Sequence, residues 1–168
     1  MPTASVADPT PRRVRAPAGY PFPDSAEAFL EWSFARDLLE RARFYWLATT
    51  GDAGTPYLTP LWGVWVDDAL YLDGAPTTRW ARNMLVRPKV AFHVGDGEQV
   101  VIVDGVADDY TADPALGGRI VDAWTGKYGS NLPEPATDGV FRVRPTVARA
   151  WSRETFRDGT AWDFPETT

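Results

Sequence analysis

Residues 69–94 decide the fold of this chain, and they read A-L-Y-L-D-G-A-P-T-T-R-W-A-R-N-M-L-V-R-P-K-V-A-F-H-V. The apolar run at 69–72 predicts a strand, which ends at the loop 73–76 because Gly and Pro interrupt regular structure. Thr77 and Thr78 then supply hydroxyl groups of the kind that cap helix N-termini. The stretch therefore predicts a strand that leads through a loop of small residues to the start of a helix.

The predicted helix is short and basic. Pro88 disfavours a helical conformation in the residue before it, so the helix is expected to end near Arg87, and residues 90–94 predict a second strand. The segment between Asp73 and Asp96 contains no acidic residue, but it contains four basic ones: Arg79, Arg82, Arg87 and Lys89. In a chain with a formal net charge of -6, this segment is a local positive island.

Two interpretations of this island remain open. A strand, a loop of small residues, two threonines and an arginine at a helix start together make a phosphate-binding site. The alternative is an ordinary surface helix with solvated arginines, because short anion-binding patterns often arise by chance.

The length of 168 residues predicts one domain. Residues 1–23 are rich in Pro, Ala and Arg, so we expect a disordered or loosely attached tail before a single domain at 24–168. The eight Trp, eight Phe and six Tyr can build a core and still leave aromatic side chains for a ligand pocket or a subunit interface.

Composition also excludes several classes of protein. The negative net charge argues against general nucleic-acid binding, which needs a basic face. The absence of cysteine removes disulfides and thiolate catalysis and fits a reducing cytoplasm. No apolar run reaches the roughly 20 residues of a membrane span, and the proline-rich N-terminus does not read as a signal peptide.

The first half of the chain predicts a helix followed by a meander of strands. A capping box at 24–27, with Asp24 as the cap, would start a helix that runs to about Arg41. Strands follow at 44–50, 55–66 and 69–72, joined by a turn at 51–54 and a tight turn at 67–68. Pro56 and Pro60 require the long strand to be an edge or bulged strand. A bulge beside Gly63 would leave backbone groups free to face a ligand.

The second half predicts a hairpin, a helix and two further strands. Strands at 90–94 and 99–110 are joined by the turn 95–98, and Asp113-Pro114 begins a helix that ends by Tyr128-Gly129. A loop at 130–138 would contribute to substrate specificity, strands follow at 140–143 and 147–151, and residues 156–164 form an aromatic, turn-rich tail. Because most strands neighbour one another in sequence, we expect an antiparallel barrel with helices outside.

The side chains that carry out catalysis in many enzymes are scarce. His93 is the only histidine, so Ser–His catalysis and a transition-metal site have little support, and a lone strand histidine is more often a packing residue. The carboxylates of Asp104, Asp108 and Asp109 could in principle form an acid–base pair, but Asp67-Asp68 and Asp108-Asp109 are more typical of turn and edge residues. A candidate phosphate site without protein-borne catalysts favours a bound cofactor, and flavins fit this description.

Four pieces of the chain carry a family resemblance. They are F-Y-W-L-A-T-T-G-D-A-G-T-P-Y-L-T-P-L-W-G-V-W-V-D-D-A-L-Y-L at 44–72, T-T-R-W-A-R-N-M-L-V-R-P-K-V-A-F-H-V at 77–94, V-D-G-V-A at 103–107 and A-W-T-G-K-Y-G at 123–129. In this order and spacing the chain resembles the pyridoxamine 5'-phosphate oxidase-like family of FMN- and F420-binding split-barrel proteins. The resemblance runs from Arg41 to Phe164.

The resemblance implies a mainly β (α+β) fold, a six-stranded antiparallel split β-barrel with peripheral helices. It implies a homodimer with the cofactor, F420 or FMN, at the subunit interface. The implied activity is hydride transfer between this cofactor and a small organic substrate. A non-catalytic carrier or sensor of the same fold is the alternative, and a purely structural interaction module is a third class.

The resemblance also assigns residues to the site. The ring system would be lined by Thr59, Pro60, Leu61 and Trp62. The phosphate would be held by Thr77, Thr78 and Arg79, with Arg82 and Lys89 nearby. At the C-terminus, Trp162 and Phe164 would cover the ring.

The chain departs from the family in two places. The nearest subgroup often ends in T-R-W-R-F, whereas this chain has Thr160-Ala161-Trp162-Asp163-Phe164, so both basic positions are lost. The C-terminal W-x-R-L-x-P pattern of true pyridoxamine phosphate oxidases is missing, so vitamin-B6 oxidation is not expected.

Overall fold

Nine strands and three α-helices build the part of the chain that the structure, a computed structural model, describes: residues 8–15, 17–20, 29–152 and 155–165. The strands are β1 (Pro11–Arg13), β2 (Tyr45–Thr50), β3 (Pro56–Leu61), β4 (Gly63–Val66), β5 (Ala69–Leu72), β6 (Lys89–Gly95), β7 (Gln99–Tyr110), β8 (Val140–Ser152) and β9 (Thr155–Asp163). The helices are α1 (Trp32–Arg41), α2 (Arg79–Val86) and α3 (Pro114–Tyr128).

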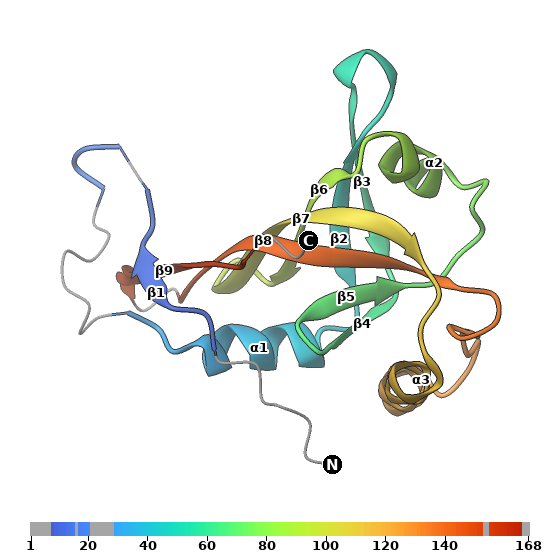
Figure 1. The fold of residues 1–168 in the computed structure, drawn as a ribbon. Helices are drawn as coiled ribbons and strands as arrows, with labels where there is room; N and C mark the ends of the chain where they lie inside the picture. Colours follow the sequence, from blue (N-terminus) through green and yellow to red (C-terminus); the bar gives the residue numbers. More distant parts are fainter. Residues whose placement is uncertain (1–7, 16, 21–28, 153–154, 166–168) are drawn as a thin grey trace.

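All strand pairs in the described sheet are antiparallel. The strands follow the order β1-β9-β8-β7-β6-β2-β3, and β5 joins β4 to β8, so the sheet branches at β8 (Figure 1). α1 runs along one side of the sheet, α3 lies beside β4, and α2 lies near the β2–β3 hairpin (Figure 1). This confirms the predicted fold class, an antiparallel β-structure with peripheral helices.

The main core lies on the inner face of the curled sheet. β2 and β6 alternate buried and more exposed residues, and α1 and α2 turn their apolar sides to the same core. The largest fully buried side chains include Trp32, Trp162, Tyr45 and Phe92. Burying an apolar side chain of this size stabilises a fold by roughly 1.5–3 kcal/mol, so these aromatic residues dominate the packing energy.

A smaller second core fills the space between α3 and the outer side of β4 and β5. It contains Ile120 and Trp124 from the helix and Val64 and Tyr71 from the strands. α3 has the ends that the sequence predicted: the Asp113 carboxylate accepts hydrogen bonds from the first-turn amides, and Gly129 closes the helix in the left-handed conformation with φ 67°.

The tight turn at 67–68 is also confirmed. Val66 pairs with Ala69, and both turn residues have positive φ, 49° for Asp67 and 55° for Asp68. This geometry matches the twist of a two-residue hairpin, and aspartate tolerates it better than most side chains.

Three expected segments differ in the structure. The predicted strand 55–66 is broken at Trp62 into β3 and β4. Strands predicted at 140–143 and 147–151 are one strand, β8, because a bulge at Thr146, opposite Asp104 and Gly105 of β7, accommodates Pro145, which has no N–H. α1 begins at Trp32, while the predicted capping box at 24–27 lies outside the described residues.

The predicted C-terminal tail is instead a strand. β9 pairs with β8, and the Asp158 carboxylate accepts hydrogen bonds from the Ser152 amide at 3.1 Å and from its hydroxyl at 2.6 Å. Asp158-Gly159 reads locally as a turn, but these cross-strand bonds and the burial of Thr160 and Trp162 favour the extended form.

The described part of the N-terminal tail contacts the domain through a short strand and through an ion pair between Asp8 and Arg36 of α1. Pro11–Arg13, within the segment expected to be disordered or loosely attached, forms β1 and pairs with β9. The Arg12 guanidinium makes two hydrogen bonds to the Asp163 carboxylate, which lower the pKa of Asp163. With β1, β9 and the two halves of the broken strand, the described sheet has nine strands rather than six. Among the described residues, no helix is long and apolar enough to span a membrane.

Candidate cofactor site

The start of α2 has the features of an anion-binding site. Thr78 occupies the N-cap position in an extended conformation, but its hydroxyl donates to the Ala75 carbonyl at 2.9 Å and accepts nothing from the helix. The amides of the first turn therefore have no side-chain cap. Uncapped amides at a helix N-terminus favour negative charge, and the exposed Thr77 and Arg79 stand beside them.

Arg79 connects this helix start to β3. Its guanidinium carbon lies 4.6 Å from the centre of the Tyr57 ring, within the range of a cation–π contact. A guanidinium stacked by its face keeps its N–H groups, which point outward in its plane, available to an anion. Tyr57 and Thr59 lie on the same face of β3, about 7 Å apart along the strand. The structure therefore places Arg79, a predicted phosphate residue, beside the strand that carries Thr59, a predicted ring residue.

The rest of the positive island is only partly neutralised. Arg87 forms an ion pair with Asp52 at 3.5 Å, and both side chains are exposed. Arg82 and Lys89 are exposed and form no ion pair with any described residue. Exposed pairs contribute little to stability, so these side chains remain able to meet an anionic ligand.

The 73–76 loop also borders an acidic pocket. This pocket has a volume of about 260 Å³ and is lined by Asp73, Asp109 and Asp138, together with Gly74 and Pro76 of the loop. A phosphate would be repelled from these carboxylates. An anionic ligand is therefore expected at the basic start of α2 rather than in this acidic pocket.

The predicted ring residues lie at the edge of the sheet. β3 pairs only with β2 in the described sheet; Thr59 and Leu61 face inward, partly buried, and Pro60 faces outward, exposed. Trp62, just beyond the strand, stacks on Tyr128 of α3 with ring centres 4.5 Å apart and planes 8° from parallel. The prolines therefore sit on an edge strand, as expected.

The expectation that backbone groups near Gly63 are free is wrong. The Gly63 amide donates to the Tyr128 hydroxyl at 3.0 Å, and the Gly63 carbonyl lies 2.9 Å from the same hydroxyl. Glycine is required at this position, because an added Cβ would lie 2.8 Å from the Leu72 side chain and from the Tyr71 carbonyl oxygen. The interruption between β3 and β4 at Trp62 is thus held in place by hydrogen bonds and close packing at Gly63.

Trp162 does not line this site. It is fully buried, packs edge-on against Trp32 at 5.3 Å, and belongs to a strand that β8, β7, β6 and β2 separate from β3 in the sheet order. A fully buried indole offers no surface to a ligand ring, so its predicted role is corrected to a core residue. Phe164 also contacts Trp32, with ring centres 5.2 Å apart.

Sequence reasoning missed Tyr57, Lys127 and Tyr128 as parts of this region. The family resemblance included the A-W-T-G-K-Y-G piece, so its lysine and tyrosine were visible but had no assigned role. Their partners are in β2 and β4, more than sixty positions away, and no periodicity within α3 indicates such contacts.

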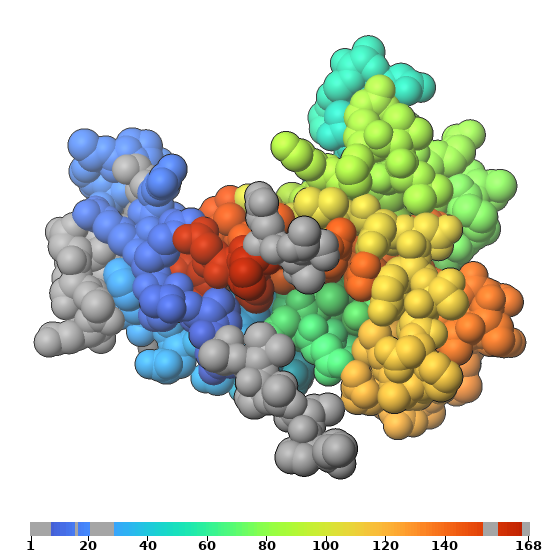
Figure 2. Space-filling model, in the orientation of Figure 1, coloured from blue at the N-terminus to red at the C-terminus, as the bar shows by residue number. Residues whose placement is uncertain are grey.

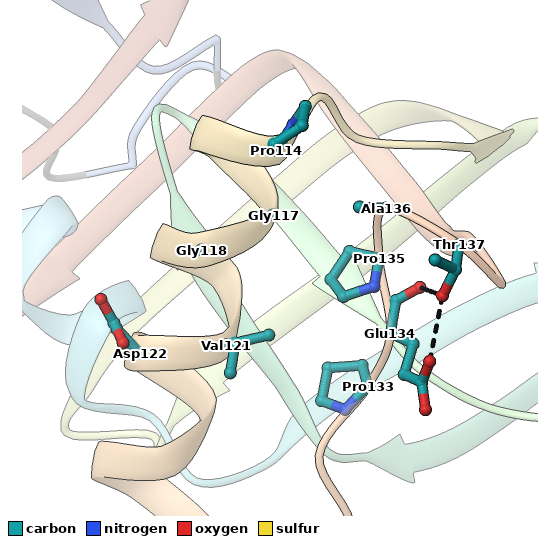
Figure 3. Close-up of a pocket in the computed structure, with 10 residues that line it drawn as sticks. All are labelled: Pro114, Gly117, Gly118, Val121, Asp122, Pro133, Glu134, Pro135, Ala136 and Thr137. Carbon is teal, nitrogen blue, oxygen red and sulfur yellow. Dashed lines mark hydrogen bonds between the residues drawn. The ribbon is translucent and has the colours of Figure 1, made fainter.

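The loop at 130–138, expected to influence substrate specificity, closes a groove against the first half of α3. The groove has a volume of about 390 Å³ and a mostly apolar lining, with Pro133 and Pro135 opposite Gly117 and Val121 (Figure 3). The space-filling view places α3 on a different part of the surface from α2 and the β2–β3 turn, which project together (Figure 2). The groove is therefore separate from the candidate phosphate site.

Comparisons with known proteins agree with the fold. The family model described as pyridoxamine 5'-phosphate oxidase matches residues 33–152. A solved structure described as an F420 reductase is 30% identical, with 67% of this chain and 94% of that chain covered and a TM-score of 0.52. No curated protein matches the chain.

Two more distant structures show the same fold. A FAD-binding protein from Mesorhizobium loti is 21% identical, with 80% of this chain and 96% of that chain covered and a TM-score of 0.56. The heme storage protein HutZ from Vibrio cholerae is 19% identical, with coverage of 70% and 91% and a TM-score of 0.55.

Proposed function

The chain belongs to the pyridoxamine 5'-phosphate oxidase family, and from this premise we propose that it is an oxidoreductase that transfers a hydride between bound F420 or FMN and a small organic substrate. The observation that carries this proposal is the uncapped start of α2 with Arg79 stacked on Tyr57 of β3. This arrangement supports the proposal, because uncapped helix amides and an arginine that favour an anion lie beside the strand that the family resemblance assigns to the ring.

The residues present fit such a cofactor. The first-turn amides of α2, the Thr77 and Thr78 hydroxyls and Arg79 would hold the phosphate, because all of them can donate hydrogen bonds to an anion. Thr59, Pro60, Leu61 and Trp62 would contact the ring. The cofactor itself supplies the hydride chemistry, so the protein contributes binding, orientation and exclusion of water.

A binding protein without turnover is the second candidate. Two ionisable side chains of the described residues hydrogen-bond to Gly63, and both are already engaged within the protein: the Lys127 ammonium is bonded to three oxygen atoms, and burial raises the pKa of the Tyr128 hydroxyl. A carrier or sensor needs no proton donor there, and one structure with this fold is described as a heme storage protein.

A titration separates these possibilities. Saturable quenching of F420 or FMN fluorescence by the purified chain supports both candidates, and no binding of either cofactor refutes them. Oxidation or reduction of the bound cofactor by a panel of small organic electron acceptors and donors then supports the oxidoreductase. Tight binding without any turnover favours the carrier or sensor.

A further inference from the structure

The last turn of α3 sends two side chains to the break between β3 and β4. The Tyr128 hydroxyl accepts a hydrogen bond from the Gly63 amide and lies 2.9 Å from the carbonyl oxygens of Gly63 and Arg43. It donates its single hydrogen to one of these carbonyls at a time. Its ring carries the stacked indole of Trp62, so one side chain fixes both the backbone and the aromatic group at the break.

Lys127 supports the same point from the other side. Its Nζ donates to the Ala42 carbonyl and the Tyr45 hydroxyl, each at 2.9 Å, and to the Gly63 carbonyl at 3.4 Å. The three N–H groups of an ammonium thus meet three acceptors, and Nζ also lies 5.0 Å from the centre of the Tyr45 ring. Tyr45 is fully buried and donates in turn to the Leu39 carbonyl, which anchors the network in the core.

The contacts of Lys127 and Tyr128 lie at the C-terminal end of the predicted ring-binding segment, residues 59–62. Residues 59–61 belong to an edge strand with one neighbour, so their pairing to β2 alone leaves the exit of the segment weakly held. Gly63, which permits the close approach of β5, has no side chain of its own with which to fix that exit.

We propose that Lys127 and Tyr128 are positioning residues, which set the backbone and indole at Trp62–Gly63 and thereby shape the surface that receives the cofactor ring. This inference rests on the proposed function, because it assigns a role within the same site. Neither residue needs to touch the cofactor to act in this way.

Because Lys127 can lose its charge, the proposed role predicts that cofactor binding depends on pH. Burial lowers the pKa of Lys127 to about 8, and the nearby Glu40 carboxylate opposes this shift. The other groups that face it are the Tyr45 and Tyr128 hydroxyls, whose pKa values burial raises, and Arg43, which lies over the Tyr128 ring. Both tyrosines therefore keep their protons when Lys127 loses its charge.

Loss of the proton weakens the support at Gly63. A neutral amine has two N–H groups for three acceptors, so one hydrogen bond is lost, and the longest is to Gly63. Cofactor binding should therefore weaken as the pH rises through about 8.

The contribution of Lys127 to the free energy of unfolding changes in the opposite direction. Because the folded chain holds the Lys127 proton less tightly than the unfolded chain, stability increases as the pH rises from about 8 towards the ordinary lysine pKa of about 10.4. Loss of the Lys127 proton therefore does not weaken cofactor binding by destabilising the fold.

The test measures the Kd of FMN and of F420 for the full chain between about pH 6.5 and pH 9.5. We expect Tyr128→Phe, which keeps the ring and removes the hydroxyl, to bind about three- to tenfold more weakly at all pH values. Lys127→Met should bind weakly at pH 7 and lose the pH dependence. Thr125→Val, on the same helix turn but with a hydroxyl that donates to the Val121 carbonyl of its own helix, should behave like the wild type.

The outcomes distinguish the positioning role of Lys127 and Tyr128 from the proposed binding of F420 or FMN. Wild-type affinity and pH dependence in both variants overturn the inference and leave the proposed function intact. Absence of binding in the wild type overturns the proposed function and this inference together. If Lys127→Met does not fold, Tyr128→Phe and the wild-type pH profile decide.

Discussion

Arg79 joins the two halves of the candidate site, and its removal gives the most direct prediction at the scale of single residues. Arg79→Ala should weaken binding of FMN and F420 roughly ten- to hundredfold, because a hydrogen bond to a charged group contributes about 1.5–3 kcal/mol. Fluorescence titration measures this loss. Arg41→Ala, an exposed arginine at the end of α1, is the matched control and should bind normally.

Single residues differ in how well the sequence predicts them. Thr78 and Arg79 were predictable because a capping hydroxyl and an arginine at a helix start are local signals. Trp162 was not, because an indole near the C-terminus has the same local pattern whether it covers a ligand or fills a core. The structure shows that Trp162 fills the core, because β9 pairs with β8 and this pairing brings the indole into the buried interior.

At the scale of elements, α3 offers a test of stability. Asp113 caps its first turn, and these amide bonds lower the pKa of the carboxyl group. Asp113→Ala should reduce Tm by about 2–4 °C near neutral pH. Asp122→Ala, exposed on the same helix and without a capping role, should change Tm much less.

The pH dependence of this effect has a defined sign. A carboxyl group with a lowered folded-state pKa contributes stability above its unfolded pKa of about 3.9, and this contribution is lost as the pH falls through the folded value. The difference in Tm between the wild type and Asp113→Ala should therefore shrink in acid. A constant difference down to about pH 2.5 would contradict the capping role.

The basic segment of α2 and β6 predicts the choice of cofactor. FMN ends at one phosphate, whereas F420 continues into an anionic oligoglutamate tail that Arg82 and Lys89 can attract. F420 should therefore bind more tightly than FMN, and its affinity should fall more steeply with salt. Titrations at low and high salt measure both slopes. Equal slopes would exclude the contact with the tail, and tighter binding of FMN would reverse the assignment.

Elements with strong local patterns were predicted, and those that depend on distant partners were not. α3 has a proline, a capping aspartate and a terminal glycine, so both of its ends were placed correctly. The strand 55–66 was predicted as continuous, because the break at Trp62 is held by Tyr128, a residue of another element. β1 was missed because three residues rich in Arg and Pro carry no strand signal without β9 beside them.

For the whole molecule, the outer face of the sheet predicts a homodimer. Phe44, Trp46 and Leu58 expose 51%, 39% and 55% of their surface there, and the Trp46 ring lies parallel to that of His93. An exposed apolar surface on a sheet that has its core on the other side is typical of an interface. Light scattering at micromolar concentration should give twice the mass of one chain.

Variants identify the face involved. Leu58→Asp should shift the protein to monomers, because the interface would then bury a charge. Leu132→Asp, at an equally exposed leucine in the 130–138 loop, should leave the dimer intact. A monomeric wild type would refute the predicted dimer and, with it, the prediction that the cofactor lies between subunits.

The packing of the core has an optical consequence. Trp65 and Trp162 are buried, and their indole N–H groups have no described hydrogen-bond partner, so their emission should lie at short wavelength and shift to longer wavelength when water reaches them. Flavins and deazaflavins absorb in the region where such indoles emit. Energy transfer from the core should therefore report cofactor occupancy in the unmodified chain, and the colour of the residual emission should show at the same time whether the fold is intact.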